Sequence, residues 1–523
     1  FVCHLAGRKD FRDMTCAQTV LIMLTIWLTT LSKSHSLSRT MGKRPSHAPL
    51  FMSTTTGYSF PRVIVKRNRQ SMSFREGNPL IFTRAIAYTE SQTHESSLPL
   101  ASLVQVDVLL DKTNHNRKHQ QKDYPHYQRS QNAQTQSIGW GVFNPSSMYR
   151  VRMLCHSVNM RENLRDKLKW AETEEEALSC ILTTQLESAF QVRKALGLFH
   201  DKSNASSLYT DTFRLINGEG DGLSGLAADV IGGDVLVVMS SAAWCQVHKD
   251  LIICCLKQVL DYNNLDYDIM WKTTPARLSQ DGMEVSDEGT TTHEKEDTRV
   301  LATELGIQYV TFPYASGQKT GYYCDQRENR WNLAHYCKDA RVLDLCCYHG
   351  GFALSAVIRG QAAHATGVDS SQQAIDACNM NANLNDCGDK VKFVRDDISK
   401  FMKEAETQGD SFNVIILDPP KLAPSVSGLD RAKRKYHGLN RDALKLIDTK
   451  LGGLLMTCTC SAAMTQQNGG QYFLNMVQQA AIAAGRHITL LKVSGAAPCH
   501  SQSPASFPAG NYLTAAIFYV APL

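Results

Sequence analysis

The sequence predicts an α/β protein whose C-terminal part is a doubly wound, Rossmann-like parallel sheet, preceded by a central α+β domain and a small β-barrel. Three observations lead to this prediction. Four apolar, strand-like runs between residues 342 and 417 each end in glycine or an acidic residue, and helix-like segments separate them. Residues 163–199 place apolar side chains close to one helical face. Short alternating strands occupy residues 63–65, 79–82, 103–110 and 149–154.

The first strand, turn and helix of the C-terminal sheet lie in residues 342–352, VLDLCCYHGGF. The adjacent glycines Gly350 and Gly351 let the backbone approach a ligand closely, and the first N–H groups of the next helix point at that ligand. The second strand ends in Asp369, 25 residues beyond Asp344, where an acidic side chain is able to bind the hydroxyls of a ribose. A glycine pair alone is equally typical of an ordinary turn between strand and helix.

Two further strands end in acidic residues. The third strand runs into VRDD at residues 394–397, and the fourth, residues 412–417, runs into DPPK, which begins at Asp418. The carboxyl ends of parallel strands meet at one edge of a sheet, so we expect a ligand there. A nicotinamide-binding Rossmann domain is the competing assignment. It expects G-x-G-x-x-G, whereas this turn reads CYHGG, so S-adenosylmethionine (SAM) is the favoured cofactor.

Length and composition predict a globular chain of about three domains, since 523 residues with 43% hydrophobic and 20% charged side chains bury a sizeable core. The formal charge of +5 is mild, so a nucleic-acid surface must be a local patch. The 16 cysteines show no C-x-x-C pairs at zinc-ribbon spacing. We interpret them as reduced thiols, and we predict no metal site.

Residues 1–60 have the composition of a targeting segment. No Asp or Glu occurs between Met14 and Arg75, and residues 17–31 form an apolar run of signal-peptide length. That run is shorter than the roughly 20 residues of a membrane-spanning helix, so we expect no stable membrane association of the mature protein. A two-part plastid address is predicted. Mitochondrial import is the alternative, and a cytoplasmic location applies if the segment is an artefact of the gene model.

The predicted domains are a β-barrel at residues 61–155, a linking domain at 156–300 and the parallel sheet at 301–523. The barrel carries a polar stretch at residues 111–136, rich in His, Lys, Gln and Asn, which we interpret as a solvated insertion. In the linking domain, a strand opens into an acidic glycine-rich loop with Glu219 and Asp221. A structural turn is favoured there over a metal site, because no further ligands follow at fixed spacing.

Two polar stretches flank the glycine turn in the sequence. GQKTGYYCDQR, which ends at Arg327, packs side-chain donors between glycines and aromatic residues, and we assign Gln326 to the cofactor site. Capping and pairing on the next helix is the alternative for Asp325 and Arg327. Beyond the DPPK motif, a basic run is predicted to hold RNA phosphates and to stack a base, although a solvated helix face is the ordinary interpretation of such a run. The predicted RNA-binding residues are Lys421, Arg431, Arg434, Lys435 and Tyr436.

Together these motifs closely resemble those of the 23S ribosomal RNA cytosine-5 methyltransferase family of the large-subunit type. Members of this family combine an RNA-binding PUA domain, a linking domain and a class I SAM-dependent methyltransferase domain. The resemblance extends from about Pro61 to Val520, and the sequence departs from the family's Asp-His-Pro at Cys499-His500-Ser501. The motifs that carry it are RLINGEGDGLSGL, GQKTGYYCDQR, YHGGF, VRDD, DPPK and TCTCS.

The resemblance implies a SAM site and a nucleophilic cysteine in this chain, with large-subunit ribosomal RNA as the partner. The cysteine is Cys460. Its thiolate adds to C6 of cytosine, while Asp418 supports the developing charge through N3. The motif at Asp418 has no second thiol, so another base must remove the C5 proton. The residues implied for SAM are Tyr348, Gly350, Gly351, Asp369, Asp397 and Asp418.

Two alternatives to this function stay open at the level of the sequence. One is an amino-group methyltransferase acting on adenine or guanine, which needs no cysteine. The other is a catalytically silent RNA-binding protein.

The choice between Cys458 and Cys460 rests on how deeply each thiol lies in the sheet, because both thiols point to the same face of an extended strand. The later residue lies nearer the ligand edge, which favours Cys460 as the nucleophile.

Overall fold

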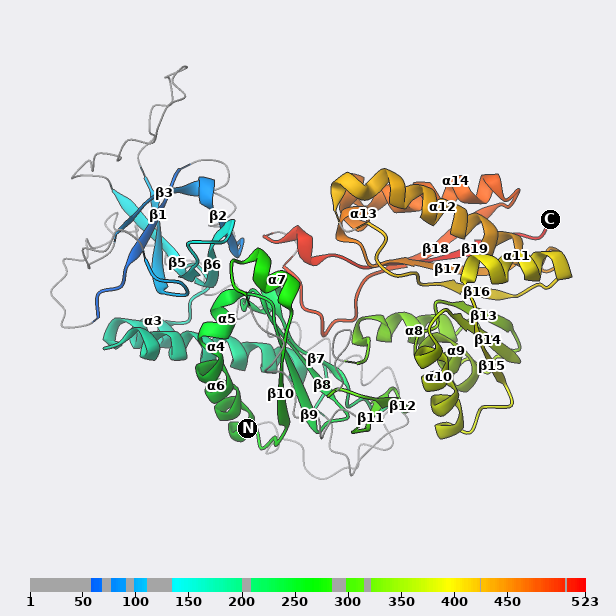
Figure 1. Ribbon diagram of the computed structural model, residues 1–523, viewed down its shortest axis with the longest axis horizontal. Coiled ribbons are helices and arrows are strands. Elements are labelled where there is room, and N and C mark those ends of the chain that lie inside the picture. The colour runs from blue at the N-terminus through cyan, green and yellow to red at the C-terminus, as the bar shows by residue number, and fades with distance from the viewer. Residues whose placement is uncertain are drawn as a thin grey trace, which may run out of the picture. The chain divides into compact units, whose positions relative to one another are not determined.

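A seven-stranded sheet with the order β15-β14-β13-β16-β17-β19-β18 organises the C-terminal part of the computed structural model (Figure 1). Neighbouring strands from β15 to β17 are parallel, and β19 is antiparallel to both β17 and β18. The strands are β13 (Arg341–Leu345), β14 (His364–Asp369), β15 (Val391–Arg395), β16 (Val414–Leu417), β17 (Gly453–Thr459), β18 (Ile488–Ser494) and β19 (Thr514–Val520). All four predicted strands are present, which confirms the predicted doubly wound sheet.

Helices cover both faces of this sheet (Figure 1). Val342 and Ile416 share one core with α8 (Arg327–Ala334), α9 (Gly351–Ile358) and α10 (Gln372–Leu384). Leu343 and Ile415 point the other way, into a core with α11 (Ile398–Gln408), α12 (Leu429–Lys445), α13 (Ala462–Gln466) and α14 (Gln471–Ala483). Burial on both faces explains why these strands are continuous apolar runs in the sequence. The order of strands reverses at β13 and β16, and the carboxyl ends there form the expected ligand crevice.

The structure describes residues 58–67, 77–90, 98–110, 134–199, 208–284, 298–314, 321–423, 425–503 and 506–523. Most of the predicted targeting segment and of the predicted insertion at 111–136 lies outside these residues. Tyr58 is already part of the fold, since its backbone N–H donates to the carbonyl oxygen of Ala171 at 3.2 Å. The targeting segment at residues 1–60 stays a prediction. None of the helices in the described ranges has the length and apolar character needed to cross a membrane.

A six-stranded mixed sheet with the order β2-β6-β5-β4-β1-β3 stands where the barrel was predicted. Within the described ranges β2 and β3 are edges, so the sheet is not closed there. The prediction missed two of its strands, β3 and β5. Gly139 and Gly141 weaken the strand signal of β5 in the sequence. The structure requires glycine there because β6 approaches closely, and a Cβ on Gly139 would lie 2.1 Å from the carbonyl oxygen of Cys155. The strands are β1 (Arg62–Val65), β2 (Leu80–Phe82), β3 (Ile86–Glu90), β4 (Leu103–Leu109), β5 (Thr135–Phe143) and β6 (Tyr149–His156).

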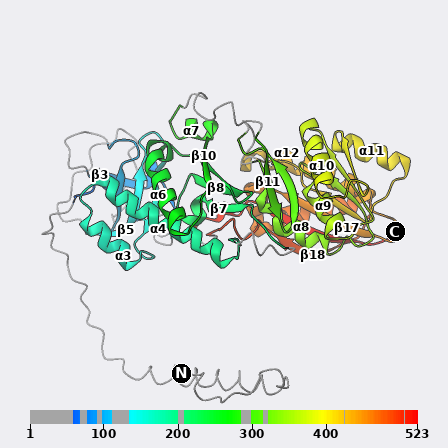
Figure 2. The ribbon, with the colours of Figure 1, turned by 90° about the horizontal axis from the view of Figure 1, so that it is seen from below.

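The central part contains two long helices where the sequence predicted one helical stretch. Thr173 is extended and caps the second helix by accepting a hydrogen bond from the backbone N–H of Glu176. Figure 2 shows α4 and α6 beside the central strands and α3 next to α4. The helices are α3 (Glu162–Trp170), α4 (Glu174–Ala195), α5 (Ala243–Val247), α6 (Lys249–Tyr262) and α7 (Pro275–Gln280). The strands are β7 (Phe213–Asn217), β8 (Leu226–Ile231), β9 (Val235–Ser240) and β10 (Asp268–Thr273), in the order β10-β9-β8-β7, and the hairpin β11 (Val300–Glu304) and β12 (Ile307–Thr311) follows.

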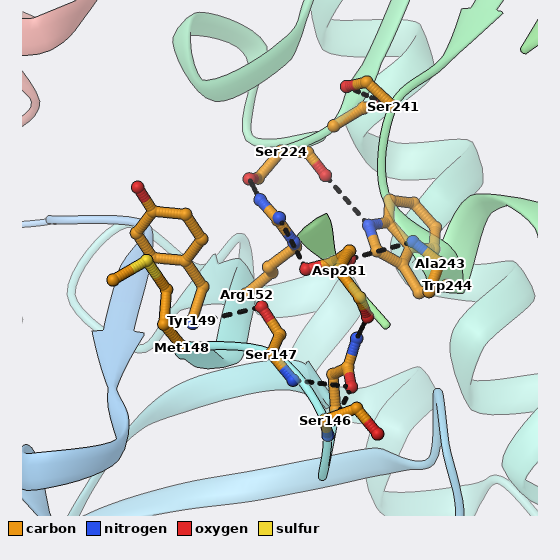
Figure 3. Close-up of polar contacts among 12 residues, drawn as sticks. Ser146, Ser147, Met148, Tyr149, Arg152, Ser224, Ser241, Ala243, Trp244 and Asp281 are labelled. Atoms are coloured by element: carbon orange, nitrogen blue, oxygen red, sulfur yellow. Dashed lines mark hydrogen bonds and ion pairs between the residues drawn. The ribbon is translucent and has the colours of Figure 1, made fainter. Parts of the chain in front are cut away.

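A buried ion pair joins the first sheet to the central domain (Figure 3). The guanidinium of Arg152 on β6 lies 3.1 Å from the carboxylate of Asp281 and donates to the Ser224 hydroxyl at 2.9 Å. The other carboxylate oxygen of Asp281 accepts the backbone N–H of Ala243 at 2.9 Å, and the Trp244 indole donates to the Ser224 carbonyl oxygen at 2.8 Å. These contacts pair the two buried charges, although the Nε of Arg152 has no hydrogen-bond partner among the described residues, and they fix β6 against α5 and the end of α7.

The acidic glycine-rich loop is a structural turn, as the sequence favours. Asp221 accepts two hydrogen bonds from the guanidinium of Arg193 at 2.7 and 2.9 Å, and Glu219 accepts the Ser224 hydroxyl at 2.8 Å. Arg193 also donates to the carbonyl oxygen of Cys499 at 2.6 Å. The C-terminal segment that departs from the family pattern therefore docks on this loop.

Candidate active site

Four acidic side chains converge at the carboxyl edge of the parallel sheet. They are Asp344 in β13, Asp369 at the end of β14, Asp397 after β15 and Asp418 after β16. All four raise the pKa of the Cys346 thiol, after burial as the largest cause. Because β15, β14, β13 and β16 pair in parallel, the acidic strand ends of the sequence analysis lie side by side at this edge.

The glycine turn lies at the same edge. Gly350 has a φ of +77°, and a Cβ there would lie 3.0 Å from the Phe393 ring, so the position favours glycine twice over. The Tyr348 ring stacks on His349 at 3.8 Å between centroids and meets the Tyr323 ring edge-to-face at 4.8 Å. Helix α9 begins at Gly351, and the backbone N–H of Ala353 in its first turn donates to the Asp344 carboxylate at 3.0 Å. The glycine turn is therefore tied to β13 at the edge where a cofactor is expected.

Asp369 holds the turn in place. One of its carboxylate oxygens accepts the backbone N–H of Tyr348 at 3.1 Å, and the other accepts that of Ser371 at 3.0 Å. Each oxygen has a second acceptor site. The predicted ribose contact is thus compatible with this geometry and stays a prediction.

Asp344 is buried, with 1% of its surface exposed. One carboxylate oxygen accepts the backbone N–H of Ala353 at 3.0 Å, and the other has no hydrogen-bond partner among the described residues. Burial raises the pKa of this carboxyl to about 7, with smaller contributions from Asp418 and Asp369. A buried oxygen that lacks a donor beside the glycine turn fits a cationic cofactor such as SAM.

Asp397 is the N-cap of α11. One carboxylate oxygen accepts the backbone N–H groups of Ser399 and Lys400 at 2.9 and 3.0 Å. The side chain is exposed, so the cap leaves it accessible from the crevice side. Its predicted contact with the cofactor is not tested by these contacts.

The two candidate thiols differ in depth in the way that the sequence analysis expects. Cys458 lies inside β17 with none of its surface exposed, and burial raises the pKa of its thiol well above the usual value. Cys460 follows the last residue of β17 and is half-buried. An accessible thiol at the strand end is the better nucleophile, because the buried one is held in its protonated form.

Gln326 contacts Asp418 at the carboxyl edge of the sheet. Its amide N–H donates to the Asp418 carboxylate at 2.9 Å, and its amide oxygen accepts from Asn329 at 2.6 Å. A hydrogen bond from Gln326 also opposes the rise in the pKa of Cys458. Gln326 has these partners and only 5% of its surface exposed, and its predicted contact with the cofactor stays a prediction.

Tyr323 belongs to the site although the sequence analysis did not single it out. Burial raises the pKa of its hydroxyl to about 12, and the charges of Asp325, Cys460 and Asp418 add to the rise. The ring thus lies between Tyr348 at the glycine turn and the thiol at the end of β17. Its position within GQKTGYYCDQR, which the sequence analysis noted for its polar donors, was the available signal.

The predicted RNA-binding residues divide into two groups. Arg431, Arg434 and Lys435 are exposed on α12, and Lys421 is exposed in the loop before it. Tyr436 has no exposed surface, and its hydroxyl accepts a hydrogen bond from Thr459 at 2.9 Å. The prediction that Tyr436 stacks an RNA base is therefore wrong, because the amphipathic helix turns this ring into the core. Asp430, Lys433, Arg434 and His437 line a shallow depression on the exposed side.

Comparisons with known proteins cover most of the chain. Residues 325–478 match the family model described as Conserved hypothetical protein 95. A protein of Klebsiella pneumoniae (strain 342) called Ribosomal RNA large subunit methyltransferase I is 30% identical over 456 residues, which cover 87% of this chain and 97% of the relative. Its counterpart in Enterobacter sp. (strain 638) is 32% identical over 71% of this chain and 85% of the relative.

Solved structures share the fold. A methyltransferase crystallised in complex with SAH superposes with a TM-score of 0.61 at 19% identity, covering 88% of this chain and 99% of that one. A SAM-dependent methyltransferase from Streptococcus mutans superposes with a TM-score of 0.60 at 18% identity over the same shares. At these identities the likeness concerns the fold, and it extends beyond the parallel sheet to most of the described chain.

Proposed function

Because this chain belongs to the ribosomal RNA large subunit methyltransferase I family, we propose that it methylates C5 of a cytosine in large-subunit ribosomal RNA. Family membership makes it a SAM-dependent methyltransferase of that RNA. The finer assignment, to C5 and through a covalent adduct, is carried by one observation. A half-buried thiol, Cys460, ends β17 at the edge where the acidic strand ends and Asp418 converge.

The cysteine is required because C5 of cytosine is a poor nucleophile. The Cys460 thiolate adds to C6 by forming a carbon–sulfur bond, and the electron pair of the C5–C6 double bond becomes available at C5. C5 then accepts a methyl group. A base next removes the C5 proton, the double bond re-forms, and the carbon–sulfur bond breaks to release the thiolate. The target base must leave its stack to reach the thiol.

Asp418 stabilises the adduct in this proposal. Addition at C6 places negative charge on the pyrimidine ring, and a carboxyl group beside N3 shares a proton with it. The Gln326 amide holds one oxygen of Asp418 at 2.9 Å, so that the plane of the carboxyl group is fixed before the base arrives. Pro419 and Pro420 follow directly and stiffen the loop that carries it.

SAM is the methyl donor, and when bound it supplies an electrophilic methyl group. The residues that would hold it are the glycine turn from Tyr348 to Gly351, together with Asp344 and Asp369. Support comes from the left-handed backbone of the turn at Gly350 and from the buried carboxylate oxygen of Asp344, which lacks a donor among the described residues. Asp397 remains a further candidate at the rim.

Asp369→Ala is expected to weaken SAM binding tenfold to a hundredfold, which corresponds to about 1–3 kcal/mol. The change removes the predicted acceptor for ribose hydroxyls and also the acceptor of the Tyr348 N–H. Calorimetric titration with SAM measures the effect. Asp376→Ala, which removes an exposed carboxylate from α10, is the matched control and should bind SAM like the wild type. If Asp369→Ala binds SAM as tightly as the wild type, the cofactor does not contact Asp369 and the proposed site is wrong.

The exposed cations of α12 are expected to hold RNA phosphates. Replacing Arg431, Arg434 and Lys435 with glutamine should weaken RNA binding and reduce the slope of log affinity against log salt by about 2, without changing SAM affinity. A triple variant of exposed lysines on another part of the domain is the control, and it should keep the wild-type slope. Its positions are Lys390, Lys392 and Lys403. If both triple variants behave alike, α12 is an ordinary solvated helix.

We further propose that the N-terminal sheet is an RNA-binding domain of the PUA type and that the protein works in the plastid. The first rests on the family resemblance and the second on the acid-free composition of residues 14–75.

The proposed reaction is tested on large-subunit ribosomal RNA from cells that lack this protein. Incubation of that RNA with the enzyme and SAM, followed by nucleoside mass spectrometry, should yield 5-methylcytidine. A methylated adenosine or guanosine in its place would favour amino-group methylation.

A further inference from the structure

A buried chain of hydrogen bonds reaches Asp418 from the end of β18. The Ser494 hydroxyl donates to the side-chain oxygen of Asn329 at 2.7 Å, and the Asn329 amide donates to the side-chain oxygen of Gln326 at 2.6 Å. The Gln326 amide in turn donates to the Asp418 carboxylate at 2.9 Å. Asn329 has no exposed surface. The hydrogen bonds thus run along the carboxyl edge of the sheet from β18 to Asp418, and their central residue, Asn329, is shielded from solvent.

The direction of every amide in this chain is fixed by its partners. The Asn329 nitrogen also donates to the backbone carbonyl oxygen of Gly495 at 3.0 Å, and a carbonyl oxygen only accepts. The side-chain oxygen of Asn329 must then face Ser494, and the oxygen of Gln326 must face Asn329. As a result the Gln326 nitrogen is turned toward Asp418, where the carboxylate accepts its hydrogen.

We propose that Asn329 is a positioning residue for Asp418, acting through the amide of Gln326. The inference rests on the proposed function, since it gives Asp418 a role in the reaction. Pro419 and Pro420 have no N–H to offer the carboxylate that they follow, so a side-chain donor takes on part of this task. Asn329 determines that the nitrogen of the Gln326 amide, and not its oxygen, faces Asp418. The hydrogen bond from Ser494 holds the Asn329 side chain in the orientation that this requires.

Reversing the Gln326 amide is the expected consequence of losing the Asn329 donor. In Asn329→Asp the side chain keeps its shape but presents oxygen to both Gln326 and Gly495. The Gln326 amide is then expected to flip, so that its nitrogen faces the new carboxylate at position 329. Its oxygen then faces Asp418 and repels the Asp418 carboxylate. Methyl transfer should slow roughly tenfold to a hundredfold at saturating substrates, as expected for a lost hydrogen bond to a charged group. The dissociation constants of SAM and RNA should stay within about twofold of wild type, because neither ligand touches Asn329 in the proposed site.

A double-mutant cycle tests whether Asn329 acts through Gln326. Gln326→Met keeps the length of the side chain but has no amide to orient. Asn329→Asp is expected to slow the wild type and to cause no further loss in the Gln326→Met background. Independent losses that multiply in the double variant would overturn the proposal, because a merely structural role of Asn329 does not depend on Gln326.

Controls separate folding from positioning. Asn440→Asp buries the same new carboxylate in α12, away from the chain of hydrogen bonds, and should lower the melting temperature without slowing methyl transfer. If Asn329→Asp does not fold, Asn329→Ser removes the amide without adding a charge and replaces it in the cycle. A wild-type protein that methylates no ribosomal RNA overturns the proposed function and this inference with it. An active wild type with multiplying losses overturns only the inference.

Discussion

Cys460→Ala is expected to abolish methyl transfer to RNA, whereas Cys458→Ala is expected to retain it. The half-buried thiol at the end of β17 has no substitute, because the buried Cys458 is held protonated by its surroundings. Removing a nucleophile that forms a covalent intermediate costs several orders of magnitude in rate, and alanine supplies no replacement. Transfer of a labelled methyl group to RNA measures both variants directly.

The two cysteine variants are also expected to differ in stability. Cys458 lies in the core shared with α8, α9 and α10, so Cys458→Ala should lower the free energy of unfolding by about 1 kcal/mol. Cys460→Ala should unfold like the wild type and bind SAM with unchanged affinity. If Cys460→Ala methylates RNA at the wild-type rate while Cys458→Ala is inactive, the roles of the two thiols are reversed. Full activity of both variants would leave no covalent role for this strand end.

Asp344→Asn is expected to stabilise the cofactor-free protein progressively as pH rises from about 4 to about 8. The carboxyl has a pKa of about 7 in the folded protein against an ordinary value of 3.8, so the fold keeps a proton that the unfolded chain releases. Between these two values the folded state binds more protons, and raising the pH therefore destabilises it. The full shift corresponds to about 4 kcal/mol at most. Asparagine removes this penalty and retains an acceptor for the Ala353 N–H.

The measurement is the difference in melting temperature between Asp344→Asn and wild type across this pH range. The difference should be near zero at pH values around 4 and should grow until the pH passes about 7. Saturating SAM should shrink it, since a cation beside Asp344 stabilises the charged carboxylate of the wild type. A melting-temperature difference that does not change with pH would show that the Asp344 carboxyl does not take up a proton in this range. The raised pKa of Asp344 would then no longer support a cation-binding role for its buried oxygen.

The sequence predicted four strands of the C-terminal sheet, β13 to β16, because each of them carries two independent signals. An apolar run specifies the strand, and an acidic residue or a glycine marks its carboxyl end. The strands β18 and β19 were not predicted, and β18 is largely exposed. The N-terminal sheet carried weaker signals. Gly139 and Gly141 in β5 pack against β6, a requirement that is visible only once the strands are paired.

The sequence predicted individual residues of the candidate site but not the hydrogen bonds between them. Asp418, Cys460 and the glycine turn stand at strand ends, where the sequence alone locates them. The hydrogen bond between Gln326 and Asp418 joins residues 92 positions apart, so no local pattern reveals it. Tyr436 shows the opposite failure. Its basic neighbours suggested an RNA surface, while the helical period places this one ring on the buried face.

Covalent trapping tests the central claim most directly. RNA that carries 5-fluorocytosine at the target position blocks removal of the C5 substituent, so the adduct cannot resolve. Incubation with the wild-type protein and SAM is predicted to give a stable protein–RNA complex, and mass spectrometry should place the RNA on the peptide that contains Cys460. The complex should be absent without SAM and with Cys460→Ala. Methylation of the natural RNA with no trapped complex on the fluorinated RNA would contradict covalent catalysis by Cys460.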